Sequence, residues 1–401
     1  MKNIKSFLKK AAIFFVLPAV FMFGCMPPPS YYSGRGKKYK MQNLKIGLTN
    51  TFKQNSLVLI PKGDYEIYVG KKLKGELTSG EEYKAGIYAG ERVVIAKQKI
   101  YDDVIYLKGK TGDESLSING KKYRQNFYIE VKSNKFVVIN EIELEKYLYG
   151  VIGREMSSTW PTESIKAQAV VARTYALNSL RKQHGKDGFD LCDTTHCQVY
   201  DGIDAERPTV SAAIDATKSE IIVHSKKIAD VFYHSCCGGH TESITNVWNV
   251  NAESVKYLSG RTCHFCKDAP VYKWEVFLSY AAITEACKKK NYSVGEINKA
   301  KVRRFTKAGR IRELTLFWEN GSFVLKGDDF RRLFLDKIKS TNFEIIEKTD
   351  GIFLKGKGLG HGIGLCQYGA KGMGDKGHNY QSIISYYFPG TDIKKWQQVL
   401  D

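Results

Sequence analysis

The strongest candidate for acid chemistry in this sequence is a single glutamate, Glu155. Apolar side chains flank it on both sides, namely Val151, Ile152, Met156 and Trp160. Such neighbours remove water from a carboxyl group and raise its pKa, so that it stays protonated near neutral pH. A protonated carboxyl group can cleave a glycosidic bond, because the leaving oxygen must receive a proton. Without further context, a lone glutamate after a helix is more often a helix cap or a solvated carboxylate.

A second group of residues has the donor atoms of a metal site. Two imidazoles and two thiols fall within residues 184–197. They belong to His184, Cys192, His196 and Cys197. This donor set suits a tetrahedral zinc ion, and four protein ligands would make the site structural rather than catalytic. Two alternatives stay open. Another residue can replace His184, either Cys236, Cys237 or His240, or a disulfide can join Cys192 to Cys197.

The remaining cysteines give weaker signals. Cys263 and Cys266 have the spacing of a metal or redox pair, but one such pair alone is not specific. We expect a disulfide within this pair, or one from it to the adjacent residues Cys236 and Cys237. Cys287 and Cys366 are expected to be small buried residues.

A glycine-rich stretch spans residues 356–370. A dinucleotide-binding loop would need a strand before it, a helix after it and a βαβ unit around it, which the sequence does not suggest. Glycines also let the backbone approach a ligand closely. We therefore expect His361, Gln367 and Tyr368, which stand among these glycines, to offer donors to a sugar.

Two regions of different pattern must position these residues. Residues 41–137 show short alternating runs broken by turn residues, such as 57–60 and 65–69, which predict a β-rich region. Residues 138–401 mix helical and strand patterns, including a strand at 230–233, a hairpin around Asn320-Gly321 and a helix at 328–335. The predicted fold class is therefore α+β.

The clearest helix is predicted over residues 162–182, where apolar residues recur at helical spacing. Lys166 and Arg173 lie seven residues apart in it, so they project from nearly the same face. An unpaired buried charge is costly. We therefore expect both cations to line a cleft beside Glu155. A shorter helix is expected at 144–150, leading into a loop that carries Glu155.

The N-terminus predicts export. Four lysines precede an apolar run from Ala11 to Phe23, and Gly24 and Cys25 follow it, as in a secretory signal peptide. We expect removal of residues 1–24, acylation of Cys25 as in the lipobox of bacterial lipoproteins, and a proline-containing tether over residues 25–40. The product would be a lipoprotein of the cell membrane that faces the cell wall or periplasm. An ordinary membrane anchor is the alternative.

The charge of the chain bears on its partners. The net charge is +20, and removal of residues 1–24, with four lysines and no acidic residue, leaves +16. Such a charge favours anionic surroundings, for example cell-wall polymers or phospholipid headgroups. Nucleic acid is not expected, because the chain is exported and lacks a clustered basic-aromatic motif.

Three separated stretches resemble the SpoIID/LytB family of sporulation and cell-wall proteins. They are residues 147–175, 236–242 and 356–370, in the family's order, with Ser157 where proline is common. The resemblance implies that Glu155 is the catalytic acid of a lytic transglycosylase, that Lys166 and Arg173 assist it, and that zinc binds near residues 184–197. The residues expected to contact the glycan are Gln198, Tyr200, Tyr233, Gly238, Gly239, His361, Gln367 and Tyr368.

The implied substrate is a peptidoglycan glycan strand, most readily one stripped of its stem peptides. Glu155 would protonate the oxygen between N-acetylmuramic acid and N-acetylglucosamine, then act as base on the C6 hydroxyl, which closes a 1,6-anhydro ring. Two other functions stay open. The chain can hold glycan as an enhancer of a cell-wall amidase without cutting it, or a catalytic zinc can make it an amidase itself.

Overall fold

The computed structural model describes residues 43–400 except residues 52, 91, 99, 181, 183 and 249. The predicted signal peptide, the acylated Cys25 and the tether lie outside the described residues. Within the described range, no helix combines the length and apolar character that a membrane span needs. Helices are interspersed with strands along the chain, and the strands form several separate sheets. The α+β fold class expected from the sequence is confirmed.

Two facing sheets make up the N-terminal part. The alternating runs of the sequence become strands whose apolar residues point inward, as in β2, where Leu57 and Leu59 are buried. The first sheet has the order β13-β1-β12-β11-β8-β3-β4 and the second the order β10-β9-β2-β5-β6-β7. The strands are β1 (Leu44–Gly47), β2 (Ser56–Lys62), β3 (Tyr65–Val69), β4 (Lys72–Leu77), β5 (Tyr83–Tyr88), β6 (Arg92–Ile95), β7 (Ile100–Asp102), β8 (Val104–Gly109), β9 (Ser115–Ile118), β10 (Lys121–Arg124), β11 (Asn126–Lys132), β12 (Lys135–Ile142) and β13 (Leu191–Cys192).

A group of helices follows, centred on α2 (Thr162–Ser179). This helix is buried on nearly every side because alanine and valine fill its middle turns, and it packs against α1, α3, α7 and α8. Its start agrees with the prediction, and it ends three residues earlier than expected. The surrounding elements are α1 (Leu144–Glu155), α3 (Pro208–Ala216), α7 (Gln367–Asp375), α8 (Tyr380–Tyr387) and a sheet of β15 (Lys227–Ile228), β14 (Glu220–His224) and β24 (Asp392–Lys395), followed by α9 (Gln397–Leu400).

Residues 273–357 form a third part with a hydrophobic core of its own. Its core includes Trp274, Leu314, Phe330 and Leu354. The sequence analysis foresaw its hairpin and helix but not its separate core. Its elements are β17 (Lys273–Ser279), α5 (Tyr280–Lys289), β18 (Lys299–Phe305), β19 (Ile311–Trp318), β20 (Gly321–Lys326), α6 (Gly327–Leu333), β21 (Phe343–Lys348) and β22 (Gly351–Lys357).

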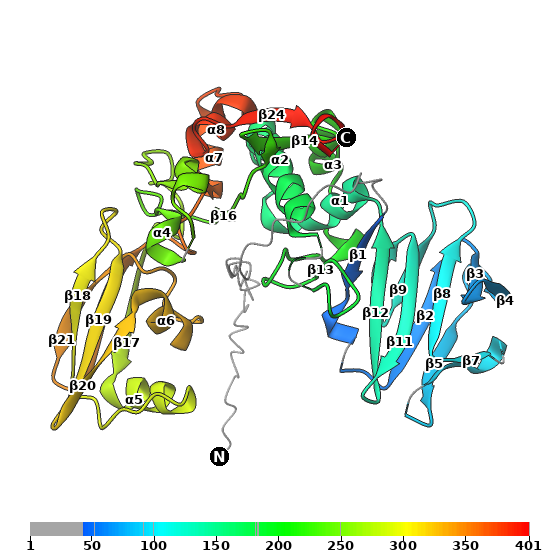
Figure 1. Ribbon diagram of the computed structural model, residues 1–401, viewed down its shortest axis with the longest axis horizontal. Helices are drawn as coiled ribbons and strands as arrows, with labels where there is room; N and C mark the ends of the chain where they lie inside the picture. The colour runs from blue at the N-terminus through cyan, green and yellow to red at the C-terminus, as the bar shows by residue number, and fades with distance from the viewer. Residues whose placement is uncertain are drawn as a thin grey trace, which may run out of the picture.

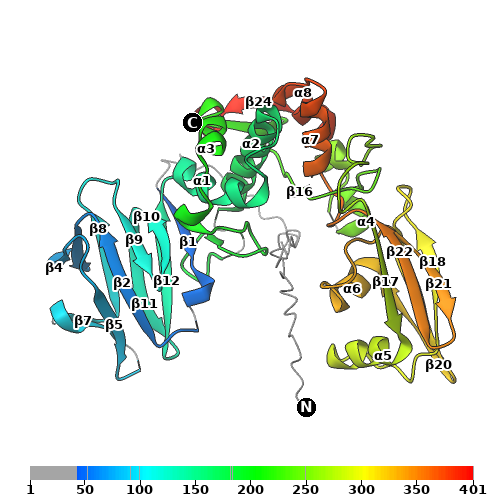
Figure 2. The same ribbon diagram turned by 180° about the vertical axis from the view of Figure 1, so that it is seen from behind.

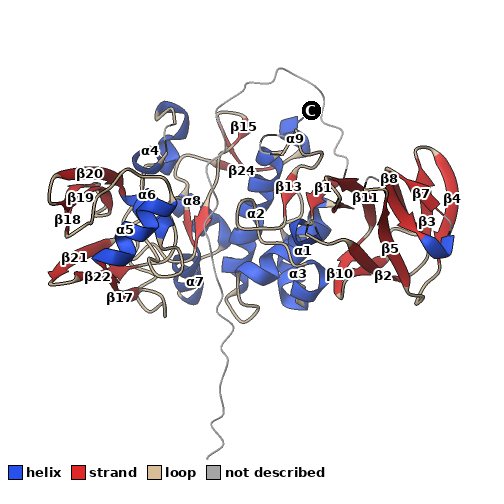
Figure 3. Cartoon of the chain, turned by 90° about the horizontal axis from the view of Figure 1, so that it is seen from below, coloured by secondary structure: helices blue, strands red, loops and turns tan. Residues whose placement is uncertain are grey.

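The three parts form an arch in which the helices lie between the two β-rich ends (Figure 1). The same order is visible from behind (Figure 2) and from below, where α2 occupies the middle of the molecule (Figure 3). Short elements connect the helical part to the third part, and the most important is a parallel pair of two-residue strands, β16 (Tyr233–His234) and β23 (Leu365–Cys366). The others are α4 (Ile244–Val247) and the short 3-10 helix at Glu253–Leu258, whereas the 3-10 helix at Gly202–Ala205 packs against α1 and β10.

Candidate functional site

The carboxyl group of Glu155 lies at the end of α1, where neutral donors reach both of its oxygens. The helix runs five residues beyond the predicted end, so Glu155 is its last residue rather than part of a loop. The hydroxyl of Tyr233 donates to Oε1 at 3.5 Å, and the side-chain amide of Gln367 donates to Oε2 at 3.2 Å. Glu155 is partly exposed, whereas both donors are buried. The site therefore combines an acid that solvent can reach with two fixed hydrogen-bond donors.

The parallel pair β16 and β23 brings these two donors together. In its register Tyr233 pairs with Leu365 and His234 pairs with Cys366. Gln367 follows Cys366 directly and begins α7, where Cys366 is the N-cap. Residues more than a hundred positions apart in the chain therefore meet on one side of Glu155.

A further hydrogen bond fixes the Tyr233 hydroxyl. Its oxygen accepts from the Gln198 amide at 3.3 Å, so its own proton can point toward Glu155. Gln198 is itself held, because Tyr147 donates to its carbonyl oxygen at 3.4 Å and its amide also donates to the Ala172 carbonyl at 3.4 Å. The structure thus joins three of the residues expected at the glycan, Gln198, Tyr233 and Gln367, to the acid.

Burial dominates the electrostatics of Glu155. Loss of solvent raises the pKa of its carboxyl group from 4.5 to about 7, although the hydrogen bonds from Gln367 and Tyr233 and the charge of Arg154 act in the opposite direction. Buried Val151, Ile152 and Met156 supply the apolar surroundings that the sequence indicated. About half of these carboxyl groups are therefore protonated near neutral pH.

Lys166 lies on the side of α2 that faces α8. Its ammonium group is 2.7 Å from Glu163, and it lies 5.8 Å from the centre of the Tyr380 ring. The second oxygen of Glu163 accepts from the Tyr380 backbone amide. Lys166 is thus neutralised by its own neighbour Glu163 and not by Glu155.

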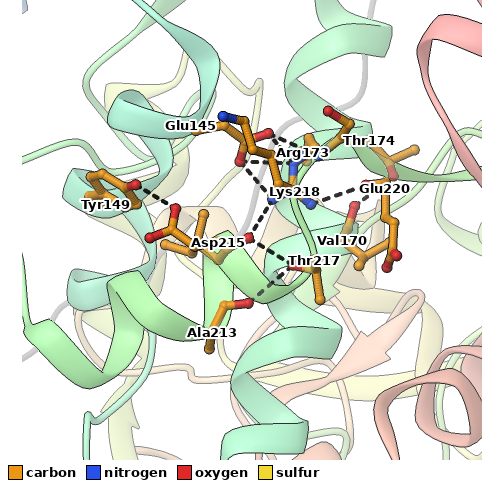
Figure 4. Close-up of polar contacts among 12 residues, drawn as sticks. Glu145, Tyr149, Val170, Arg173, Thr174, Ala213, Asp215, Thr217, Lys218 and Glu220 are labelled. Carbon is orange, nitrogen blue, oxygen red and sulfur yellow. Dashed lines mark hydrogen bonds and ion pairs between the residues drawn. The ribbon is translucent and has the colours of Figure 1, made fainter.

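The expectation that Arg173 lines a cleft does not match its position. The side chain is fully buried, and its Nη2 lies 2.7 Å from Glu145 (Figure 4). Its remaining donors bind the backbone carbonyls of Glu220 and Ile214. The sequence argument that a buried charge must be avoided overlooked a partner on α1. Arg173 holds α1, α2 and the segment after α3 together, which is a structural role.

Three further residues expected at the glycan also have packing roles. Tyr200 is buried, with its ring against Tyr147 and its hydroxyl bound to Asn140. Gly238 has a φ of 72°, and a side chain there would collide with the backbone of Lys357, so this glycine serves the packing of β22 and not an approach to substrate. His361 is buried among aromatic rings, with Nδ1 accepting from the Ile363 amide.

Tyr368 and Gly239 remain accessible beside the acid-bearing segment. Tyr368 follows Gln367, is partly exposed and lies against Trp160, with ring centres 4.8 Å apart. Trp160 was noted in the sequence only as an apolar neighbour, and this contact gives it a second role in an aromatic pair. Gly239 is also partly exposed, with the Tyr272 hydroxyl close to it.

The first predicted metal set comes together in the structure. The donor atoms of His184, Cys192, His196 and Cys197 all lie within 4.8 Å of one another. Between His184 Nε2 and His196 Nδ1 the distance is 3.2 Å, and between Cys197 Sγ and His196 Nδ1 it is 3.5 Å. Ligands around a tetrahedral zinc would be about 3.3 Å and about 3.6 Å apart for these pairs. Asp187 binds the other nitrogen of His184 at 2.8 Å, as a carboxylate behind a metal-bound histidine does.

A second group of four cysteines is also buried in one place. Cys237, Cys263, Cys266 and Cys366 have sulfur atoms within 4.8 Å of one another. The sequence analysis expected Cys366 to be a small buried residue. It is buried, and the fold also brings its sulfur atom to those of the other three, which the sequence did not predict. The described part of the chain thus contains a buried four-cysteine cluster that could bind a metal.

Comparisons with known proteins find relatives over most of the chain. The family model described as Stage II sporulation protein matches residues 132–224, and a domain family of unknown function, DUF8618, matches residues 204–364. An uncharacterised protein of Brachyspira hyodysenteriae is 33% identical over 84% of this chain and 89% of its own length. The amidase enhancer of Bacillus subtilis is 28% identical over 80% of this chain, which spans about half (51%) of that relative. Stage II sporulation protein D of Bacillus subtilis is 26% identical over 64% of this chain and 76% of its own length.

Proposed function

Since the chain belongs to the SpoIID family, we propose that it is a lytic transglycosylase that cuts peptidoglycan glycan strands with Glu155 as acid and base. One observation carries this proposal. The acid is partly buried between two neutral donors, while both cations expected beside it are bound to other carboxylates, Lys166 to Glu163 and Arg173 to Glu145. Glu155 can therefore remain protonated near neutral pH, as a general acid must.

In the proposed reaction the proton of Glu155 goes to the oxygen that links N-acetylmuramic acid to N-acetylglucosamine. The C1–O bond breaks, and positive charge develops on the ring. The glutamate, now ionised, removes the proton of the C6 hydroxyl, whose oxygen bonds to C1. The amide of Gln367 and the hydroxyl of Tyr233 stabilise the ionised glutamate between these two steps, because both donate to its oxygens.

This ring closure explains why one carboxyl group suffices. A hydrolase would use a second carboxylate to activate water or to attack the sugar. Among the described residues, the side chains that donate to Glu155 are the Gln367 amide and the Tyr233 phenol, and neither is a carboxylate.

The decisive experiment is mass spectrometry of the products from purified, peptide-free glycan. We expect 1,6-anhydromuramyl ends from the wild type and none from Glu155→Gln, which keeps the shape of the side chain. The same change at Glu253, an exposed residue that pairs only with Lys256 on the surface, is the control and should retain full activity. Equal cleavage by the wild type and Glu155→Gln would refute the assignment, and ordinary reducing ends would make the enzyme a hydrolase.

We also propose that His184, Cys192, His196 and Cys197 hold a structural zinc. The donor set is closed by four protein atoms, so the ion would supply cross-linking and not an activated water. Its effect on the site would pass through the chain, because Gln198 follows Cys197 directly and binds Tyr233. Elemental analysis of reduced protein should find zinc, and Cys197→Ser should lose the ion held by these four residues.

A non-catalytic role is the second candidate, and the similarity to an amidase enhancer over 80% of this chain favours it. The comparison of Glu155→Gln with the wild type separates the two roles. If both proteins stimulate a cell-wall amidase equally and neither releases anhydro products, the chain is an enhancer.

Export and a lipid anchor complete the proposal. Cys25 follows the cationic and apolar start of the chain. Metabolic labelling with a fatty acid should mark the wild type and not Cys25→Ala, and an unlabelled wild type would refute acylation.

A further inference from the structure

The four-cysteine cluster is assembled from three separate segments. Cys237 follows β16, Cys366 ends β23, and Cys263 and Cys266 lie in the loop before β17. All four side chains are buried, and the sulfur atoms of Cys237 and Cys266 are 3.4 Å apart. Four tetrahedral thiolates around one zinc ion would be about 3.8 Å apart in every pair. Such an ion requires all four sulfur atoms to lie close together, whereas a disulfide requires only two neighbouring sulfur atoms.

Hydrogen-bond donors lie around the sulfur atoms of the cluster, most clearly around Cys366. The backbone amides of Cys237 and Gly369 both donate to Cys366 Sγ, at 3.2 Å and 3.3 Å. The hydroxyl of Tyr387 lies 3.2 Å from Cys263 Sγ. Donors of this kind stabilise a metal-bound thiolate, and they orient the ligand as the surroundings of metal sites generally do.

A buried cation beside the cluster gives an independent indication. Arg310 is 1% exposed, and its Nη2 donates to the backbone oxygen of Cys237 at 2.7 Å. Two other nitrogens of the same guanidinium, Nε and Nη1, have no hydrogen-bond partner among the described residues. An uncompensated buried charge is costly. The buried carboxylate of Glu242 offsets part of this charge. Zinc with four thiolates is a dianion, so the cluster in its metal-bound form would add further negative charge beside the two nitrogens that lack a partner.

We infer that Cys237, Cys263, Cys266 and Cys366 form a second, structural zinc site, separate from the one at His184–Cys197. Binding converts four thiols to thiolates and releases their protons to solvent. The ion joins the loop that carries Cys263 and Cys266 to both strands of the parallel pair. Two paired strands of two residues each cannot hold their register unaided, and the metal supplies the cross-link that they lack.

The position of this site ties it to the acid. Cys366 stands directly before Gln367, which donates to Glu155, and Cys237 lies four residues after Tyr233, the other donor. The claim that this zinc positions the donors of Glu155 rests on the proposed function, whereas the presence of the zinc does not. Metal content and activity are therefore measured separately.

The first test is zinc stoichiometry on the mature protein, purified with a reductant. We expect about two zinc ions per chain for the wild type and about one for either Cys263→Ser or Cys197→Ser. Cys287→Ser is the matched control, because Cys287 is an equally buried cysteine in the third part, outside the cluster, and it should retain both ions. An unchanged zinc content in Cys263→Ser would overturn the inference.

A second measurement needs no variant, so it holds even if Cys263→Ser does not fold. X-ray absorption at the zinc edge of the wild type should give an average of about three sulfur ligands and one nitrogen ligand per zinc, since one site has two cysteines and the other four. An average of two sulfur ligands would leave only the first site. Detection of disulfides among these four cysteines in protein isolated without reductant would also overturn the inference. Loss of the second zinc with normal turnover would remove the positioning role and leave the metal site intact.

Discussion

The raised pKa of Glu155 can be tested through stability, without any substrate. A carboxyl group whose pKa is higher in the folded protein than in the unfolded chain stabilises the fold in its protonated form. That contribution is fully present below pH 4.5 and is lost as the pH rises through about 7. Glutamine does not titrate. Glu155→Gln should therefore gain stability relative to the wild type as the pH rises.

The magnitude follows from the size of the shift. A rise from 4.5 to about 7 corresponds to about 3 kcal/mol between pH 4 and pH 8. Because Glu155 is partly exposed, solvent reduces this value, and we expect about half of it. For a folded unit of about 150–250 residues, each kcal/mol of unfolding free energy corresponds to about 2–4 °C in melting temperature. The difference in melting temperature between Glu155→Gln and the wild type should thus grow by about 3–6 °C from pH 4 to pH 8.

The assay is thermal unfolding of both proteins across this pH range, followed by far-UV circular dichroism. Glu163→Gln, on the neighbouring helix, is the control, because its stability relative to the wild type should change with pH in the opposite direction. Burial alone would raise the pKa of Glu163, but hydrogen bonds from Lys166 and the Tyr380 amide lower it, so this variant should lose stability as the pH rises. A melting difference for Glu155→Gln that stays constant between pH 4 and pH 8 would show that Glu155 ionises normally, and the argument for a general acid would fail.

Four other outcomes follow from the contacts described above. Gln367→Met keeps the volume but removes a donor to ionised Glu155, which should raise its pKa by about one unit and move the alkaline limb of the rate profile upward, measured as activity against pH. Arg173→Ala leaves Glu145, whose side chain is only 14% exposed, without its cation and should cost about 3 kcal/mol of stability by chemical denaturation. Lys166→Ala breaks only a partly exposed pair and should cost about 0.5 kcal/mol; equal losses in the two variants would contradict the structural role of Arg173. Chelation of the proposed zinc at His184–Cys197 should lower the melting temperature of the wild type, and no change would favour a disulfide there.

Local signals in the sequence were enough for many single elements. β3 coincides with the predicted run 65–69, β19 and β20 form the hairpin expected around Asn320-Gly321, and α2 begins where proline and threonine indicated. Each of these depends on neighbours within a few positions. The contact between Glu155 and Gln367 spans 212 positions, and only the resemblance to a family placed these residues in one site.

The errors have a common physical origin in partners that lie far away in the chain. Arg173 was expected in a cleft because its charge had no visible partner, yet Glu145 and two carbonyls satisfy it. The cluster around Cys366 was not foreseen, because its three neighbours in space lie in other segments. Gly238 was assigned to substrate, but the close contact that it allows is with Lys357, the last residue of β22. In each case the residue type indicated that a specific partner was needed, but it did not indicate which residue would be that partner.

The two glutamines of the acid network share a structural setting. Gln198 follows Cys197 and Gln367 follows Cys366, so each comes directly after a cysteine of one of the two clusters. Each cluster also includes the last residue of a two-residue parallel strand, Cys192 in β13 and Cys366 in β23. Strands this short contribute little stability by themselves. A metal ion at each end would fix the backbone from which the glutamines reach Tyr233 and Glu155, and a catalytic acid needs such fixed donors because small displacements weaken hydrogen bonds steeply.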